Sequence, residues 1–234
     1  MIPLQVIYED NHLIAVNKPA GVLVQADQTG DPCLADYVRQ YIKERYEKPG
    51  NVFLGTIHRL DRPVSGAILF ARTSKGLARM NELFRKREIE KEYLALTRQR
   101  PAPLQGTLEH FISKDRAHNV ARAYDKKSKK AQAAGAKPAR LHYRMIGQLE
   151  GLVLLRIQLE TGRPHQIRVQ LASSGMPIYG DVKYGSEEAL DDGSIGLHSY
   201  CLRFLHPVKN KPVRITAGLP RTPHWSLFSE LVGQ

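Results

Sequence analysis

A single carboxylate, Asp61, stands between Arg59 and Arg62 in a segment that neighbouring Pro, Ser and Gly residues mark as a turn. The two cations favour the ionised form of Asp61, which predicts a nucleophile or a base rather than a proton donor. The alternative is a surface turn in which Asp61 pairs with its own arginines. Such exposed pairs are common and contribute little stability. On this stretch alone the surface turn is the stronger interpretation.

A second group of polar side chains crowds the start of a helix that the sequence predicts from Pro164 to Gly175. These residues are Arg163, His165, Gln166 and Arg168. The start of a helix presents backbone N–H groups that bind anions. Few other metal-ligating residues lie near His165, so a structural histidine is a better interpretation than a metal ligand. The chain has no P-loop, no GxGxxG and no zinc spacing, and we predict neither a metal nor a cofactor.

Two apolar runs must position Asp61. Residues 52–57 lead into its turn, and residues 67–72 leave it as a buried strand. Residues 6–9 and 13–21 predict two further strands, residues 34–46 predict a helix, and residues 73–87 predict a helix whose outer face is basic. Other strands are expected at residues 140–149, 152–159, 197–207 and 213–217. Asp61 therefore lies between two buried segments.

Tyr93 lies in a run, residues 89–97, whose alternation predicts a strand. Its side chain shares a face with Ile89, Lys91 and Ala95. Tyr93 is either a core residue or a platform on which a base stacks.

The charge of the chain points to a polyanionic partner. Its 234 residues are 42% hydrophobic, which is enough for a real core, and 35 Lys and Arg outnumber 23 Asp and Glu to leave a net charge of +12. Nucleic acid is the leading candidate, and an anionic membrane surface is the competitor. We expect no membrane partner, because no segment approaches the length of a spanning helix. The N-terminus does not resemble a signal peptide, and Cys33 and Cys201 lie far apart, which fits a reducing cytoplasm.

The basic charge is concentrated in one segment. Residues 114–144 contain ten Lys or Arg and only two Asp, a net charge of +8. Within this basic arm, residues 126–138 have no apolar period beyond alanine, which predicts a mobile hairpin tip or loop that includes Lys126 and Lys127. A loop that only aids solubility is the alternative. The density of charge favours contact with a nucleic-acid backbone.

Together these stretches resemble the pseudouridine synthases of the RluA type, which isomerise uridine to pseudouridine in structured RNA. Residues 9–21 look like the opening of the catalytic domain, and residues 58–61 followed by Ser65-Gly66 look like its signature. Residues 91–95 and 161–168 are similar to its second and third motifs, and residues 180–185 with 197–198 to its late ones. One departure is Val64, where the family usually has Thr, and the departure leaves the acid in place.

The resemblance implies a role for each motif residue. It makes Asp61 the catalytic aspartate, Tyr93 the residue that stacks on the target base, and Arg168 the partner that keeps Asp61 ionised. Because the target uridine lies in a stem or a stacked loop, it must be flipped into a pocket. The resemblance implies that Arg59 fills the gap that the flipped base leaves. The remaining predicted substrate-binding residues are His58, Arg62, Arg163, His165, Lys126 and Lys127.

The resemblance also implies the fold: a single α+β domain over residues 1–234, with a long, mixed, mostly antiparallel sheet, flanking helices and a central catalytic cleft. We expect no N-terminal S4 domain, because the first catalytic motif begins at residue 9. The expected partner is structured RNA, either 23S-type rRNA or tRNA, and the protein is expected to act as a monomer in the cytoplasm.

Three other functions compete with this one. A non-catalytic RNA chaperone or ribosome-assembly factor would keep the scaffold and the basic surface, but binding alone needs none of Asp61, Tyr93 and Arg168. A glycoside hydrolase usually needs two carboxylates, and no second acid has a setting comparable to that of Asp61. A DNA-binding module is disfavoured because no helix-turn-helix or finger pattern is present.

Overall fold

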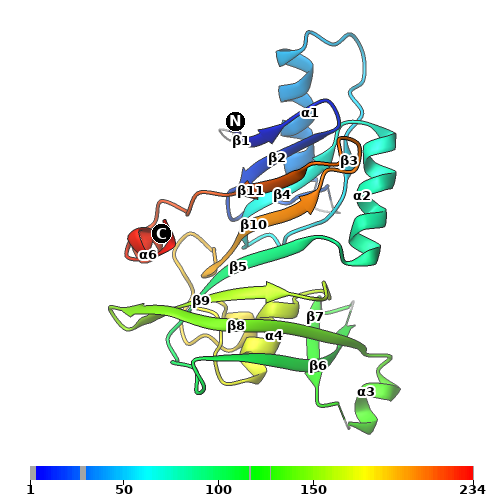
Figure 1. Cartoon of the computed structure of the whole chain (residues 1–234). Coiled ribbons are helices and arrows are strands. Elements are labelled where there is room, and N and C mark those ends of the chain that lie inside the picture. The colour runs from blue at the N-terminus through cyan, green and yellow to red at the C-terminus, as the bar shows by residue number, and fades with distance from the viewer. Residues whose placement is uncertain (1–3, 27–29, 116, 127, 234) are drawn as a thin grey trace. The chain divides into compact units, whose positions relative to one another are not determined.

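The computed structural model describes residues 4–26, 30–115, 117–126 and 128–233, which form two compact units (Figure 1). Among the described residues, those up to Glu90 and His198–Pro220 belong to the first unit, and Lys91–Leu197 and those from Arg221 onward belong to the second.

The first unit contains a sheet whose described strands lie in the order β1–β2–β4–β10–β11, with β3 beside β4. All of these pairs are antiparallel except β4 with β10, which is parallel. The central strands β2 and β4 are almost continuously apolar because both of their faces are covered. The strands are β1 (Gln5–Glu9), β2 (Leu13–Lys18), β3 (Gly55–Thr56), β4 (Ser65–Ala71), β10 (Leu197–Leu205) and β11 (Pro212–Thr216).

Two helices belong to this unit, α1 (Leu34–Arg45) and α2 (Ser74–Lys86). Thr73 caps α2, since its hydroxyl oxygen accepts a hydrogen bond from the Gly76 N–H at 3.0 Å. Arg87 ends α2 in the left-handed conformation, with φ of 61°. Met80 of α2 is fully buried in a core shared with β2, β4, β10 and β11. The predicted helices at 34–46 and 73–87 are therefore confirmed.

The second unit is built on five antiparallel strands in the order β5–β9–β8–β6–β7. Helix α4 packs on one face of β6, β7 and β8, where Val169 meets Ile112, Ala121 and Ala139 (Figure 1). The strands are β5 (Glu90–Thr97), β6 (Gln105–Asp115), β7 (Val120–Tyr124), β8 (Lys137–Leu149) and β9 (Leu152–Leu159). The helices are α3 (Lys129–Ala133), α4 (Gln166–Ser173), the 3₁₀ turn η1 (Val182–Tyr184), α5 (Pro223–Ser226) and α6 (Ser229–Val232).

Helix α4 differs from the prediction at its start. It begins at Gln166, two residues after Pro164, because His165 takes the left-handed conformation with φ of 51° and stands at the N-cap. The predicted end is correct, since Gly175 follows the helix with φ of 76°. A left-handed histidine has no signature in the apolar spacing, which is why the pattern placed the start too early.

The basic arm also differs from the prediction. Residues 126–138 were expected to form a loop, but residues 129–133 form the short helix α3. Ala131 is buried, so the alanines of this stretch do supply a small apolar contact. Ala and Lys are good helix formers, which an analysis of apolar period alone overlooks. Lys127 lies outside the described residues.

The fold class is confirmed as α+β, with a mixed and mostly antiparallel set of strands flanked by few helices. The helices of the described ranges include none long and apolar enough to cross a membrane.

Candidate active site

Asp61 lies in the connection between β3 and β4. Its carbonyl oxygen accepts a hydrogen bond from the Val64 N–H at 3.1 Å, which closes a four-residue turn. Leu60 and Val64 are 9% and 2% exposed, so the core holds the turn at both ends. Asp61 is half-buried and Arg59 is exposed. The turn therefore presents the carboxylate on a backbone that packing has already fixed.

Lys18, the last residue of β2, is fully buried next to this turn. Its Nζ donates hydrogen bonds to the carbonyl oxygens of Pro19 at 2.9 Å and Arg62 at 3.1 Å. The pKa of Lys18 is lowered to about 7, mainly because the group is buried. The negative charge of Asp61 acts to raise this pKa, and the positive charge of Arg62 acts to lower it. Lys18 was not among the predicted site residues. The signal that points to it is a lysine at the end of an apolar strand.

The Arg62 side chain also holds the turn, through contacts with Gly21 and Asp31. Its Nε donates to the Gly21 carbonyl oxygen at 2.9 Å, and its NH2 lies 3.1 Å from Asp31 Oδ2. The backbone of Arg62 also accepts a hydrogen bond from the Gly21 N–H at 2.8 Å. The surface-turn interpretation, in which Asp61 pairs with its own arginines, is therefore wrong for Arg62, because this guanidinium binds Gly21 and Asp31.

His58 anchors the chain just before the turn. Its Nε2 accepts a hydrogen bond from the Leu69 N–H of β4 at 3.0 Å. Its ring also stacks on Phe84 of α2, with centroids 5.3 Å apart. These contacts assign His58 a part in positioning Asp61. Substrate contact by His58 stays a prediction.

The Ser65-Gly66 pair of the signature meets His198 and Ser199 in the parallel bridge between β4 and β10, and His198 belongs to a late motif. Gly66 has φ of 114°, and a Cβ at this position would lie 2.2 Å from the Ser199 carbonyl oxygen. Only glycine fits there. Ser65 Oγ lies 2.9 Å from His198 Nδ1, and burial lowers the pKa of His198 to about 4, so this histidine is neutral at pH 7.

Arg168 points from the first turn of α4 to Asp181. Its Nε and NH2 donate hydrogen bonds of 2.7 and 2.8 Å to the two carboxylate oxygens. The side chains are 7% and 1% exposed, so this is a buried bidentate pair. The ring of Tyr184 also faces the guanidinium, whose Cζ lies 5.0 Å from the ring centroid. Asp181 and Tyr184 lie in a predicted motif, but neither was assigned a role.

Side-chain hydrogen bonds hold the residues that precede α4. The Gln166 Oε1 accepts hydrogen bonds from the Thr161 hydroxyl at 2.8 Å and the Arg163 N–H at 2.9 Å. The Gln166 Nε2 donates to the Arg140 carbonyl oxygen at 3.1 Å. His165 Nδ1 lies 2.6 Å from the Tyr184 hydroxyl. The polar residues of this motif thus fix the backbone from which Arg168 projects.

Tyr93 is in β5, opposite Ile157 of β9, and is 8% exposed. In the register of the sheet it shares a face with Ile112, on which α4 packs. Lys126 is exposed just after β7.

The predicted residues fall into both units. The first unit holds His58, Arg59, Asp61 and Arg62 in one short segment. The second unit holds Tyr93, Lys126, Arg163, His165 and Arg168. Within the second unit, His165 and Arg168 both meet Tyr184.

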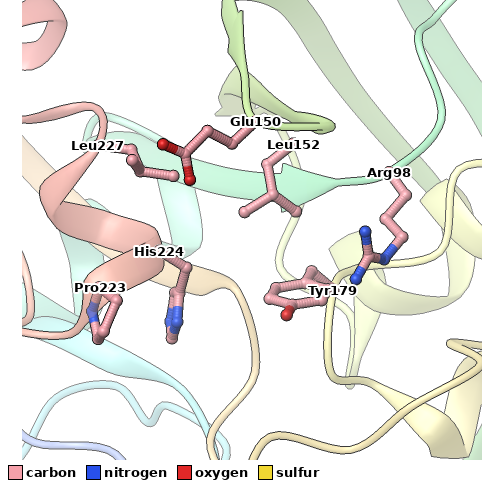
Figure 2. Close-up of a pocket in the computed structure, with 7 residues that line it drawn as sticks. All are labelled: Arg98, Glu150, Leu152, Tyr179, Pro223, His224 and Leu227. Carbon is pink, nitrogen blue, oxygen red and sulfur yellow. The ribbon is translucent and has the colours of Figure 1, made fainter.

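The second unit also contains a cavity of about 280 Å³ whose lining includes none of these residues (Figure 2). The Arg98 guanidinium stands over the Tyr179 ring at 5.0 Å and also binds Glu188, while the His224 ring meets Tyr179 edge-on at 5.8 Å. None of its seven lining residues belongs to the predicted site. In the described part of the chain, no group of three or more His, Cys, Asp or Glu is placed to hold a metal ion.

Known proteins resemble this chain over most of its length. A ribosomal large subunit pseudouridine synthase D from Zymomonas mobilis is 31% identical, over 94% of this chain and 70% of that protein. A tRNA pseudouridine synthase C from Haemophilus influenzae is 34% identical, over 92% of this chain and 93% of that protein. The solved structure of human RNA Pseudouridylate Synthase Domain Containing 4 has the same fold, with a TM-score of 0.77 at 24% identity over 96% of this chain and 92% of that one.

A family model described as RNA pseudouridylate synthase matches residues 12–173. That range includes Asp61, Tyr93 and Arg168. The chain therefore belongs to the RNA pseudouridylate synthase family, and it is an isomerase that converts uridine to pseudouridine in RNA.

Proposed function

We propose that this enzyme isomerises specific uridines of structured rRNA or tRNA, with Asp61 as its catalytic carboxylate. Tyr93 stacks on the target base, and Arg168 stabilises the ionised form of Asp61 when the enzyme acts. We further propose that the protein works as a monomeric single domain in the cytoplasm and that His58, Arg59, Arg62, Arg163, His165 and the arm lysines Lys126 and Lys127 contact the RNA.

The reaction conserves every atom of the uridine. The N1–C1′ bond breaks, the uracil turns while it is held, C5 bonds to C1′, and the C5 proton is lost while N1 gains one. An anionic oxygen near the sugar serves this chemistry by attack on C1′, by deprotonation of C2′, or by addition to C6. A stacked aromatic ring retains the detached uracil, with a stabilisation of about 1–3 kcal/mol.

The observation that carries the proposal is the way in which the fold fixes Asp61. Leu60 and Val64 are buried and hold the turn in the core. Lys18 donates a hydrogen bond to the Arg62 carbonyl oxygen, and the Arg62 side chain binds the backbone of Gly21. His58, three residues before Asp61, accepts a hydrogen bond from β4. A surface carboxylate with no function needs no such support. Fixing a catalytic group before the substrate arrives is a main source of rate enhancement.

The environment of Arg168 supports the second role. Asp181 takes Nε–H and one N–H of NH2. A guanidinium is a rigid plane of N–H donors, so the bidentate pair with Asp181 fixes the orientation of the whole group. We propose that this oriented arginine in turn orients Asp61, because a guanidinium fixes a carboxylate in a way that lysine does not.

The experiment is pseudouridine mapping of total RNA by carbodiimide labelling and primer extension. It compares cells with the gene deleted, restored, restored as Asp61→Asn, and restored as Asp191→Asn, a matched change at an exposed aspartate. We expect one or a few sites to vanish on deletion and to return with the native gene and Asp191→Asn but not with Asp61→Asn. The RNA that carries those sites identifies the substrate.

Two results contradict the proposal. Recovery of the sites with Asp61→Asn means that another acid performs the chemistry. If no site changes on deletion, the rRNA and tRNA of these cells are not its substrates, and the proposed substrate class is wrong.

A further inference from the structure

The turn η1 touches two parts of the second unit that the sequence separates. Asp181 directly precedes η1 and holds Arg168, while the Tyr184 N–H donates a hydrogen bond to the Asp181 carbonyl oxygen at 3.0 Å. On its other side, Lys183 Nζ donates to the Asn119 carbonyl oxygen at 3.1 Å, just before β7. Strand β7 belongs to the basic arm, so η1 joins the arm to the arginine of the site.

The hydroxyl of Tyr184 makes the closest link to the arm. It accepts a hydrogen bond from the Ala121 N–H of β7 at 2.8 Å and lies 2.6 Å from His165 Nδ1, to which it can donate its proton. Strand β7 is the outer strand in the described order, and such a strand presents backbone N–H groups that need a partner. Tyr184 supplies one and also packs against the apolar cluster of Ile112, Ala121, Ala139 and Val169.

The ring of Tyr184 makes the link to Arg168. Its centroid lies 5.0 Å from the guanidinium carbon, and Asp181 binds the same guanidinium through both carboxylate oxygens. Arg168 is 5% exposed. One rigid side chain therefore contacts the arm with its hydroxyl and the arginine with its face.

We propose that Tyr184 is a positioning residue that holds Arg168 in its working orientation and couples this orientation to RNA bound on the basic arm. The inference rests on the proposed function, because it needs Arg168 to act in the reaction and the arm to contact RNA. RNA bound against β7 displaces the Ala121 N–H, and the hydrogen bond to this group moves Tyr184 with it. Tyr184 contacts the Arg168 guanidinium with its ring, so the guanidinium moves in turn.

Two substitutions separate the two links. Tyr184→Phe keeps the ring over Arg168 and removes the hydroxyl, so we expect kcat within about 2-fold of the native value and a KM for RNA raised about 3- to 10-fold. Tyr184→Leu removes the ring as well. We expect it to lower kcat at saturating RNA by about 10- to 100-fold, since small displacements of a catalytic group are costly. Rates are corrected for the folded fraction by thermal melting.

Tyr46 in the first unit is a matched control. Its ring also lies under an arginine, Arg72, at 4.4 Å, and its hydroxyl also donates a hydrogen bond, to Glu9 at 2.9 Å. Tyr46→Phe and Tyr46→Leu remove the same two kinds of contact outside the proposed site. We expect both to keep native kcat and KM once corrected for the folded fraction.

A double-mutant cycle tests the coupling. Lys129→Ala with Lys130→Ala weakens the arm, and this pair is combined with Tyr184→Phe. If the arm acts through Tyr184, the combined loss of RNA affinity is smaller than the product of the separate losses. A loss equal to that product overturns the coupling, and a Tyr184→Leu enzyme with native kcat overturns the positioning of Arg168.

Asp61→Asn, measured in the same assay, separates this inference from the proposed function. An active Asp61→Asn enzyme contradicts the proposed function whatever Tyr184 does. An inactive Asp61→Asn enzyme together with a native Tyr184→Leu enzyme contradicts only the role of Tyr184.

Discussion

At the scale of single residues, the proposed site and its surroundings contain ionisable groups that are buried. Lys18 lies buried beside Asp61, and Arg168 lies buried against Asp181. Removing one partner of a buried pair is costly because the other is left uncompensated. The proposed site therefore includes ionisable residues that are almost fully buried, and the titration of Lys18 should be visible in the stability of the protein.

Lys18→Met gives such a test. Burial lowers the pKa of Lys18 to about 7, whereas an unfolded lysine titrates near 10.4. Between these values the unfolded state binds one more proton than the folded state, so the native protein gains stability as pH rises through this window. We expect the free energy of unfolding of the native protein, relative to Lys18→Met, to increase from pH 7 to 10 by up to about 1.4 kcal/mol per pH unit.

Urea unfolding of both proteins at pH 7, 8.5 and 10 measures this difference. Other titrating groups are common to the two proteins and cancel in the comparison. A difference that stays constant or falls with pH means that the ammonium of Lys18 is not penalised in the folded state.

At the scale of elements, the parallel bridge between β4 and β10 decides whether the Asp61 turn can form. Ser65 and Gly66 lie four and five residues after Asp61, and they pair with His198 and Ser199. The buried Ser65–His198 contact of 2.9 Å and the close approach at Gly66 leave no room for another arrangement. The signature is thus as much a strand-pairing signal as a catalytic one.

Gly66→Ala tests this bridge. The added Cβ would lie 2.2 Å from backbone, and φ of 114° is strained for any L residue, so we expect a loss of stability above about 3 kcal/mol or no folded protein at all. Gly218→Ala is the control, because a Cβ there meets nothing within 4 Å. Thermal melting compares the two. A melting temperature for Gly66→Ala equal to that of the control would show that β4 and β10 are not this close.

At the scale of the whole molecule, the net charge of +12 acts on RNA before any specific contact forms. The basic arm carries +8 of it. Seven of its ten Lys and Arg lie in regular structure, on β7, α3 and the adjoining parts of β6 and β8. Neutralising them should change binding more than chemistry.

We expect the substitution of Lys126, Lys127, Lys129 and Lys130 by Ala to weaken RNA binding and to reduce the slope of log K against log salt by up to about 3 to 4. Single-turnover rates at saturating RNA should stay near native. The control neutralises four exposed lysines of the first unit, Lys43, Lys48, Lys75 and Lys211, and so matches the change in net charge. If both quadruple variants give the native salt slope, the arm does not bind the phosphate backbone.

The sequence by itself determined the family motifs, the fold class, most of the strands, the limits of α1 and α2 and the charge of the basic arm, but it did not predict β6 and β7. Apolar period, a Thr cap and charge density are local properties, and local properties can be read along the chain. They also identified Asp61, Tyr93 and Arg168 as candidates, but only because several separated motifs matched one family.

Only the tertiary structure decided which residues support the candidates. Lys18 at the Asp61 turn, Asp181 and Tyr184 around Arg168, and His198 beside Ser65 are contacts between segments far apart in the sequence. Spacing along the chain carries no record of such contacts, since they arise when elements pack. The left-handed His165 at the start of α4 and the helix α3 within the arm were missed for a related reason. The first depends on a backbone conformation and the second on a buried alanine, and the neighbouring residues in the sequence predict neither.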